Sequence, residues 1–320
     1  MSGSDLEDWF IVQQELPDGS VTPYQIFTPE TVAAADTPRD AAAPAASAPA
    51  PRGIVMIWPG FGMAARYYRP MARELARRGF WSVIAELHSQ GGQTAVASRK
   101  SNWGYHDLAS VDYPYAIALA RREYARQYAL STADSETVPV YLLCHSMGGQ
   151  IATLYLSRPE ADVDAVMMVG SGVPHYRNFG GKHRNRLLFG APAMRLGAHL
   201  WGYWPGGRFD PAGFGRQAGY QVREWARFAL TGRLLPKHTD FDYEQAIGQV
   251  TTPVLITTCN GDHDCPPKSA QDLAARLHRA AKFEFIEQRL GHNRWAREPE
   301  TVANRFEQFL TELPTWNPQS

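Results

Sequence analysis

The sequence predicts an α/β fold in which helices cover both faces of a mostly parallel, doubly wound sheet, with a helical cap inserted into the chain. Two observations lead to this prediction. After residue 52, short apolar runs that read as buried strands alternate with longer helical segments, a pattern typical of parallel sheets. Roughly eighty residues rich in Trp, Tyr and Phe then separate two of these strands, a gap too long for an ordinary crossover.

The N-terminal part of the chain differs from this alternating pattern. Apolar runs at 9–12 and 24–27, joined through a Pro-Asp-Gly turn, predict an antiparallel hairpin at the sheet edge. Residues 30–52 are dominated by Ala and Pro, which predicts a flexible connection rather than a domain. We therefore expect three parts: hairpin and connection at 1–52, an α/β core at 53–173 and 249–320, and the cap at 174–248.

Within the core, each apolar run is assigned in chain order to a strand and each segment between runs to a helix. The expected strands are 53–58, 80–86, 138–144, 163–170, 253–259 and 282–287. The expected helices are 64–78, 106–128, 147–158, 268–280 and 297–312.

Composition restricts the kind of protein. The chain has 320 residues, with 32 Lys and Arg balanced by 32 Asp and Glu, so no basic excess favours nucleic acid as a partner. The acidic N-terminus lacks the features of a signal peptide, and no apolar stretch approaches a membrane span. Three cysteines are too few for a disulfide framework. We expect a reduced, cytoplasmic protein; the sequence does not predict its oligomeric state.

Residues 138–151 carry the strongest functional signal. An apolar strand runs into a sharp turn with Ser146 at its apex, and a helix begins at once. This is the layout of a nucleophile elbow, which holds a serine hydroxyl clear of the sheet and close to a base. The residues two before and two after the serine must be small because the turn brings them together. Cys144 and Gly148 meet that requirement, although glycine is usual at the first position.

Two further groups follow in the chain order that a Ser-acid-His triad on this fold requires. The loop after strand 253–259 contains Asp262 and Asp264, and either carboxylate stands where the acid belongs. His292 lies on the loop between the last strand and the last helix. We expect His292 to be the base. A Cys259–Cys265 bridge across the acid loop is conceivable but disfavoured. A metal site there is disfavoured because the loop is short and the acid is needed by His292.

An oxyanion hole needs two backbone N–H groups. One comes from the residue after the nucleophile, Met147. The other comes from the loop after an earlier strand, here the glycine-flanked turn that follows residue 58 and contains Phe61.

These motifs together resemble the α/β-hydrolase superfamily, from about Gly53 to the C-terminus. The resemblance implies an α/β-hydrolase fold. The segments 62–80 and 103–108 are similar to those of a bacterial group of predicted serine hydrolases of esterase and lipase type. The chain departs from many relatives at Trp58-Pro59, where His-Gly is common, and at 86–89, where Asp-x-Arg-Gly is common.

The resemblance also bears on the two carboxylates. In relatives the acid follows the proline that opens the strand by nine residues and precedes the proline of the next helix by four. Pro253 and Pro266 both select Asp262, whereas counting from Gly261 in the form Gly-x-x-Asp selects Asp264. Because two prolines select Asp262 and one glycine selects Asp264, we expect Asp262 to be the acid.

The predicted chemistry is acyl transfer on Ser146, with small-molecule esters as substrates and no cofactor or metal required. The same triad supports acyltransferase, amidase and C–C bond hydrolase reactions. A non-catalytic binding module is the alternative from another class, and the intact triad order argues against it. Some cap aromatics are expected to line the substrate pocket, and the candidate substrate-binding residues are His145, Trp201 and Trp204.

Overall fold

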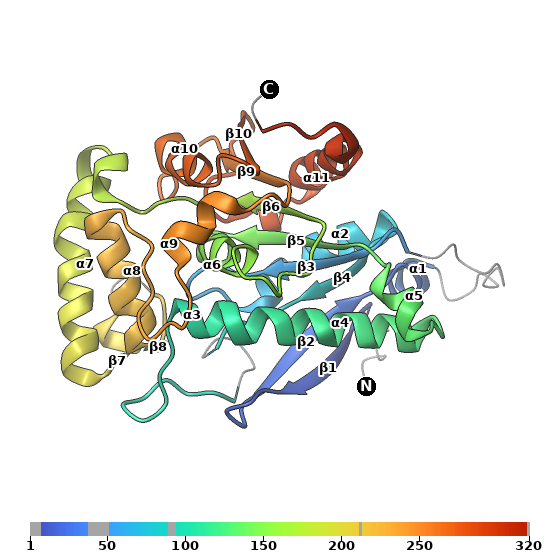
Figure 1. Cartoon of the computed structure of the whole chain (residues 1–320), viewed down its shortest axis with the longest axis horizontal. Coiled ribbons are helices and arrows are strands. Elements are labelled where there is room, and N and C mark those ends of the chain that lie inside the picture. The colour runs from blue at the N-terminus through green and yellow to red at the C-terminus, as the bar shows by residue number, and fades with distance from the viewer. Residues whose placement is uncertain (1–7, 38–50, 89–93, 211–212, 319–320) are drawn as a thin grey trace.

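The computed structural model describes residues 8–37, 51–88, 94–210 and 213–318. These residues form an eight-stranded sheet in the order β1-β2-β4-β3-β5-β6-β9-β10 (Figure 1). All neighbours from β4 to β10 are parallel, whereas β1 and β2 run antiparallel at one edge. The strand bounds are β1 (Phe10–Glu15), β2 (Val21–Phe27), β3 (Ile54–Trp58), β4 (Trp81–Ile84), β5 (Val140–His145), β6 (Ala165–Val169), β9 (Val254–Cys259) and β10 (Ala281–Ile286).

Helices cover both faces of this sheet, which is why the central strands read as continuous apolar runs. One apolar core joins alternate strand residues to α4, α6 and α10, and a second joins the intervening residues to α2 and α11. The long helices of the core are α2 (Arg69–Arg77), α4 (Tyr113–Gln127), α6 (Met147–Leu156), α10 (Pro267–Arg276) and α11 (Glu300–Glu312). Shorter helical segments are η1 (Ala65–Tyr68), α3 (Tyr105–Asp107), α5 (Thr132–Glu136) and a π-helical turn at Leu108–Asp112.

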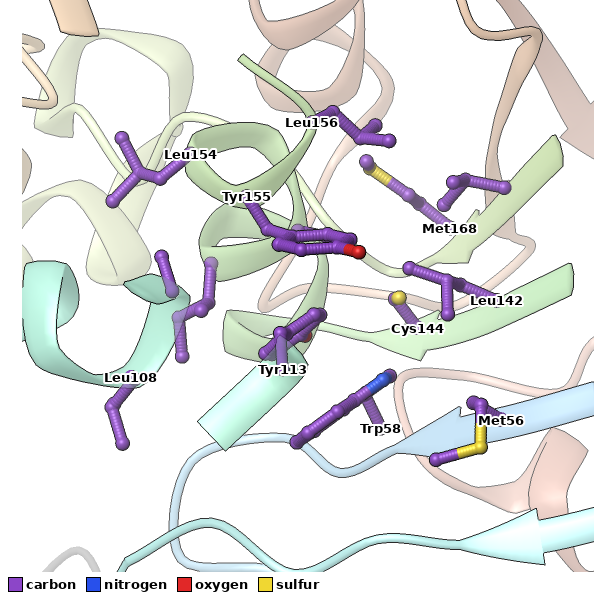
Figure 2. Packing of buried hydrophobic residues seen from close by; sticks show 14 of the residues in the cluster. Met56, Trp58, Leu108, Tyr113, Leu142, Cys144, Leu154, Tyr155, Leu156 and Met168 are labelled. Carbon is purple, nitrogen blue, oxygen red and sulfur yellow. The ribbon is translucent and has the colours of Figure 1, made fainter. Parts of the chain in front are cut away.

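Large side chains fill the core directly behind the end of β5 (Figure 2). Trp58 stacks on Tyr113 with ring centroids 3.6 Å apart, and Cys144 lies fully buried among them. The register pairs Trp58 with Cys144, so β3 and β5 end side by side. The loops that follow these two strands therefore emerge next to each other, at the carboxyl edge of the sheet.

The cap extends from that end of the molecule (left in Figure 1). It is built from α7 (Gly181–Trp201), α8 (Gly219–Thr231), the short α9 (Tyr243–Ala246) and a two-stranded pair, β7 (Tyr203–Trp204) and β8 (Gln217–Ala218). Helices α7 and α8 pack on each other through small apolar clusters. None of the helices in the described ranges combines the length and apolarity that crossing a membrane demands.

The predicted fold class is confirmed, as is the N-terminal hairpin at the sheet edge. The expected flexible connection is wrong for its first residues, since Pro29–Asp36 forms helix α1. Thr28 caps this helix by accepting a hydrogen bond from the Thr31 N–H, and Pro29 occupies its first turn, where proline is well tolerated. Residues 38–50 of the connection lie outside the described residues, and the exact limits of the three parts remain predictions.

Candidate active site

Ser146 lies between the end of β5 and the start of α6, with φ 51° and ψ −115°. A positive φ is strained for a residue with a side chain, and the turn is held by the Ser146 N–H, which donates to the Val169 carbonyl at 3.1 Å. A Cβ at Gly148 would lie 2.8 Å from the Pro59 carbonyl oxygen. Only glycine therefore allows the first turn of α6 to approach the loop after β3 this closely.

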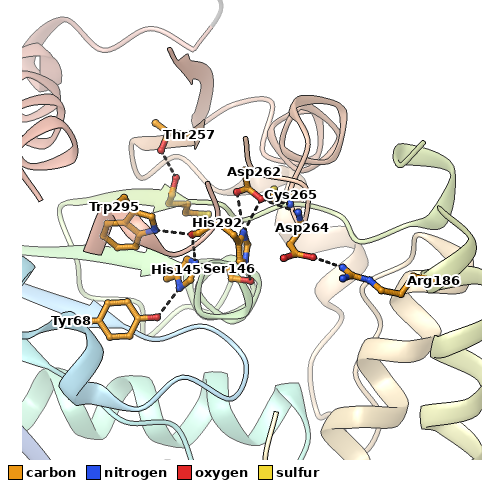
Figure 3. Close-up of polar contacts among 11 residues, drawn as sticks. Tyr68, His145, Ser146, Arg186, Thr257, Asp262, Asp264, Cys265, His292 and Trp295 are labelled. Carbon is orange, nitrogen blue, oxygen red and sulfur yellow. Dashed lines mark hydrogen bonds and ion pairs between the residues drawn. The ribbon is translucent and has the colours of Figure 1, made fainter. Parts of the chain in front are cut away.

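Three side chains from three loops converge at this turn (Figure 3). Nε2 of His292 lies 3.0 Å from the Ser146 hydroxyl oxygen. Nδ1 of the same ring lies 3.0 and 2.9 Å from the two carboxylate oxygens of Asp262. Asp262 is 6% exposed and also accepts hydrogen bonds from the N–H groups of Asp264 and Cys265 at 3.0 and 2.7 Å. The arrangement can take a proton from the serine hydroxyl and hold it on a paired imidazolium.

The neighbouring carboxylate of Asp264 faces the cap. It forms an ion pair with Arg186 of α7, and the pKa of Asp264 is lowered because that pair outweighs the effect of burial. The two carboxylates that the sequence leaves as alternatives thus have different partners: Asp262 contacts His292, and Asp264 contacts Arg186.

The pKa of the His292 imidazole is set by burial and by the Asp262 carboxylate. Burial lowers the pKa of the imidazole, but the hydrogen-bonded Asp262 carboxylate more than offsets this, so the pKa lies above its ordinary value. A raised pKa makes the ring a stronger base toward the serine hydroxyl.

His145, directly before the nucleophile, is buried and both of its ring nitrogens have protein partners. Nε2 lies 2.9 Å from the His292 carbonyl oxygen, which can only accept, so Nε2 carries the hydrogen. Nδ1 then accepts from the Tyr68 hydroxyl at 2.7 Å, and that hydroxyl accepts the Gly60 N–H at 2.9 Å. Burial and the adjacent His292 hold the pKa of His145 well below its usual range, consistent with this neutral form.

This chain of hydrogen bonds links the loop after β3, the elbow and the loop that carries His292. Trp295 adds to it by donating its Nε1–H to the same His292 carbonyl at 3.1 Å. His145 is a substrate-binding candidate from the sequence, but these contacts show that its ring joins three loops to one another.

Side chains of the cap contact Phe61 and Met147, the two predicted oxyanion-hole residues. The Phe61 ring lies 4.6 Å from that of Phe214 and 6.2 Å from that of Trp225, measured between centroids. Nε2 of Gln221, a fully buried residue of α8, lies 3.3 Å from the Met147 sulfur. Met147 is the first residue of α6, and the first N–H groups of a helix have no acceptor within it.

The two cap tryptophans expected near the substrate lie in different surroundings. Trp204 is 7% exposed and packs with Met194, Ala198 and Val222, in a small cluster that Phe61 also touches. Trp201 is 43% exposed at the end of α7. Their contact with substrate remains a prediction.

Sequence reasoning missed Gly170, which follows β6. A Cβ there would lie 3.0 Å from both Oδ2 of Asp262 and Nδ1 of His292, so a side chain would collide with the acid–base pair. It also missed Tyr68 and Gln221, because a tyrosine or a glutamine on an amphipathic segment carries no signal of its own. In the described part of the chain, no group of three His, Cys, Asp or Glu side chains is placed to hold a metal ion, and the three cysteines are free thiols.

Comparisons with known proteins identify the family and the fold. Residues 54–305 match the model of a family described as the alpha/beta hydrolase family. No curated protein matches the chain significantly.

Solved structures with the same fold include a membrane phospholipase A described as a bacterial virulence factor (16% identity, TM-score 0.60, covering 97% of this chain and 88% of that one). An esterase from Exiguobacterium antarcticum is similar at 16% identity and a TM-score of 0.57, with 94% and 100% covered. An esterase from Pyrococcus furiosus is similar at 12% identity and a TM-score of 0.56, with 98% and 95% covered. At these identities the likeness shows the fold alone.

Proposed function

Because the chain belongs to the alpha/beta hydrolase family, we propose that it is a serine hydrolase that cleaves carboxylic esters through an acyl-enzyme on Ser146. One observation carries the proposal: the His292 ring is hydrogen-bonded through one nitrogen to Ser146 and through the other to Asp262. This is the relation that nucleophile, base and acid need in such a reaction.

The residues would act in a fixed order. His292 takes the hydroxyl proton as Ser146 attacks the acyl carbon, and Asp262 stabilises the imidazolium that results. The N–H groups of Phe61 and Met147 hold the oxyanion of the tetrahedral intermediate. His292 then gives the proton to the departing alcohol, and a water molecule activated by the same imidazole releases the acid from Ser146.

The test combines covalent labelling with kinetics. The chain is treated with a fluorophosphonate probe and assayed on p-nitrophenyl esters of graded chain length, with amide and lactone controls. Ser146→Ala should abolish labelling and lower kcat by about 10⁴-fold or more. Ser157→Ala, which removes a hydroxyl at the other end of α6 that donates to the Leu154 carbonyl, is the matched control and should keep both.

Two outcomes would contradict the proposal. Labelling that persists in Ser146→Ala would mean that another residue is the nucleophile. A folded wild-type protein that neither labels nor hydrolyses any of the esters would favour the non-catalytic binding module.

A further inference from the structure

A cavity of about 700 Å³ lies in the cap between α7, α8 and the segment that follows α8, and none of the three triad residues lines it. Its walls carry four cationic side chains from three segments: Arg195, Arg223, Arg227 and Lys237. Glu224 is the one carboxylate among the lining residues. Such a density of positive charge in a concave site favours an anionic ligand.

The four cations are not neutralised by ion pairs. Most arginines elsewhere are, as Arg121, Arg233 and Arg305 are with nearby carboxylates. No ion pair within 4.0 Å joins any of the four cavity cations to a carboxylate of the described residues. Nη2 of Arg227 is moreover buried and has no hydrogen-bond acceptor there. Leaving a charged donor buried without an acceptor is unfavourable, and an anion bound against Arg227, which lines the cavity, would offset part of this cost electrostatically.

Glu224 forms no ion pair with these cations, and both of its oxygens accept hydrogen bonds from the backbone. Oε2 accepts the Tyr105 N–H at 2.8 Å, and Oε1 accepts the Lys237 N–H at 2.6 Å. These bonds fasten α8 to the start of α3 and to the segment after α8. Burial raises the pKa of the Glu224 carboxyl, and the two hydrogen bonds and the charge of Arg227 offset this only in part.

The same cavity has an apolar side that continues onto the surface. Leu196 and Leu230 belong to its lining. Leu196 is 59% exposed and shares the outer face of α7 with Phe189 and Leu200, which are 71% and 58% exposed, since positions 7 and 4 residues away lie on one side of a helix. Helix α7 is the outermost element of the cap (Figure 1), so this apolar face is turned away from the core and lies beside the cations.

We propose that the cavity binds a phosphate group attached to an apolar chain. The cations would hold the phosphate, for which the planar arginine fork is well suited. The chain would lie over Leu196 and the outer face of α7. With four cations against one carboxylate, the lining has a net positive charge that a doubly charged phosphate matches better than a singly charged carboxylate does. The site is separate from the triad, and its occupation does not depend on the proposed ester hydrolysis.

Isothermal titration calorimetry on the full chain tests the proposal with three probes: inorganic phosphate, monododecyl phosphate below its critical micelle concentration, and neutral dodecyl maltoside. Monododecyl phosphate should bind at least tenfold more tightly than either of the others. Arg195→Gln/Arg223→Gln should weaken its binding at least tenfold. Leu196→Ser/Leu200→Ser should weaken it as well while leaving the affinity for inorganic phosphate unchanged.

The matched control, Lys100→Gln/Arg126→Gln, removes two positive charges from exposed residues outside the cavity and should bind like wild type. Equal weakening in this control would overturn the proposal, because net charge alone would explain the binding. Unchanged binding in Arg195→Gln/Arg223→Gln would also overturn it. So would complete loss of binding after fluorophosphonate blocks Ser146, which would place the amphiphile at the triad.

A second measurement identifies the source of the phosphate. The chain is sedimented with vesicles of phosphatidylcholine that contain phosphatidic acid, whose headgroup is a phosphate monoester, and with vesicles of phosphatidylcholine alone. Sedimentation with the anionic vesicles that is lost in Arg195→Gln/Arg223→Gln supports a lipid headgroup within a bilayer as the ligand. Binding of monododecyl phosphate without sedimentation supports a soluble amphiphile.

Discussion

At the scale of single residues, the Tyr68 hydroxyl bridges the backbone of the loop after β3 and the ring of His145. The hydroxyl accepts the Gly60 N–H and donates to Nδ1 of His145. Gly60 precedes Phe61 in the proposed oxyanion loop, and His145 precedes the proposed nucleophile. This hydroxyl therefore helps to hold the proposed nucleophile in place relative to the N–H that would stabilise the oxyanion.

Tyr68→Phe should lower kcat about 10- to 100-fold while KM changes little, because the oxyanion loop loses its register with Ser146. It should also destabilise the fold by about 1–3 kcal/mol, since a buried N–H and a ring nitrogen lose their partner. Tyr155→Phe removes a hydroxyl that accepts a backbone N–H from Asp162 and should affect stability only. Steady-state kinetics and urea denaturation of both variants make the comparison; equal kcat values in the two would refute the positioning role.

The two carboxylates of the acid loop give a second residue-scale prediction. Asp262→Asn should lower kcat on the order of 10⁴-fold, because the amide leaves His292 in the wrong tautomer. Asp264→Asn should cost less than about tenfold, since it removes the pair with Arg186 and an electrostatic contribution to His292 that is smaller than that of Asp262. Kinetics of the two purified variants decide the matter. A larger loss at position 264 would mean that the acid has been assigned incorrectly.

At the scale of elements, the cap contacts the site through two helices. The N-terminal turns of α7 touch the acid loop through the Arg186–Asp264 pair and through His183, whose ring lies 5.1 Å from that of His263. Helix α8 touches the opposite side through Gln221 and Trp225. Both contacts lie beside residues proposed to act in catalysis, so the cap forms part of the wall of the site.

Trp225→Ala should therefore shift the preferred ester chain length by two or more carbons toward longer acyl groups, because it removes a large side chain next to Phe61. Fluorophosphonate labelling of Ser146 should persist. Trp201→Ala, at a position 43% exposed, should produce the smaller shift. A chain-length profile on p-nitrophenyl esters measures both. If Trp225→Ala abolishes labelling together with folding, the side chain holds the cap together and does not select the substrate.

The six strands of the α/β core could be predicted within one or two residues because each is an apolar run bounded by turn residues, as at 254–259; the two hairpin strands are each about three residues longer at one end than expected. Helix α1 could not, since the Thr28 cap outweighs an Ala- and Pro-rich composition that favours disorder. The triad candidates were recognisable because the chemistry restricts their chain order. The contacts of Gln221 and Tyr68 were not, because they depend on how the cap and the loops pack, which leaves no periodic pattern in the sequence.

At the scale of the whole molecule, charge is unevenly distributed. Residues 174–248 contain 11 Lys and Arg but only 5 Asp and Glu, although the chain as a whole has no net charge. The remainder is correspondingly acidic. How stability depends on pH near neutrality is set by the histidines. Four buried or partly buried histidines fall into two groups, one with raised and one with lowered pKa values.

His88 and His292 have raised pKa values: burial lowers each, but Asp112 and Asp262, respectively, more than offset it. His145 and His106 have pKa values lowered by burial. Stability from the first group is complete below the unfolded value of about 6.5 and is lost as pH rises through the folded pKa. For the second group the unfolded chain binds protons that the folded chain does not, so stability falls as pH drops below about 6.5.

The free energy of unfolding should therefore pass through a maximum near pH 6.5 between pH 5 and 8.5. Urea denaturation across that range measures it. His145→Gln should flatten the acidic side relative to wild type, and His88→Gln should flatten the alkaline side. A monotonic dependence in the wild type would show that these opposed groups do not govern the stability of the molecule.

The three buried thiols can report which regions of the folded molecule unfold locally. Cys144, Cys259 and Cys265 are each at most 2% exposed, and burial raises the pKa of each thiol, that of Cys259 to about 12. Alkylating reagents attack thiolates, so none of the three should react until its surroundings separate. Cys144 reports on the central strand, Cys259 on the end of β9 and Cys265 on the acid loop. Their relative alkylation rates would order the opening of these three regions without any engineered label.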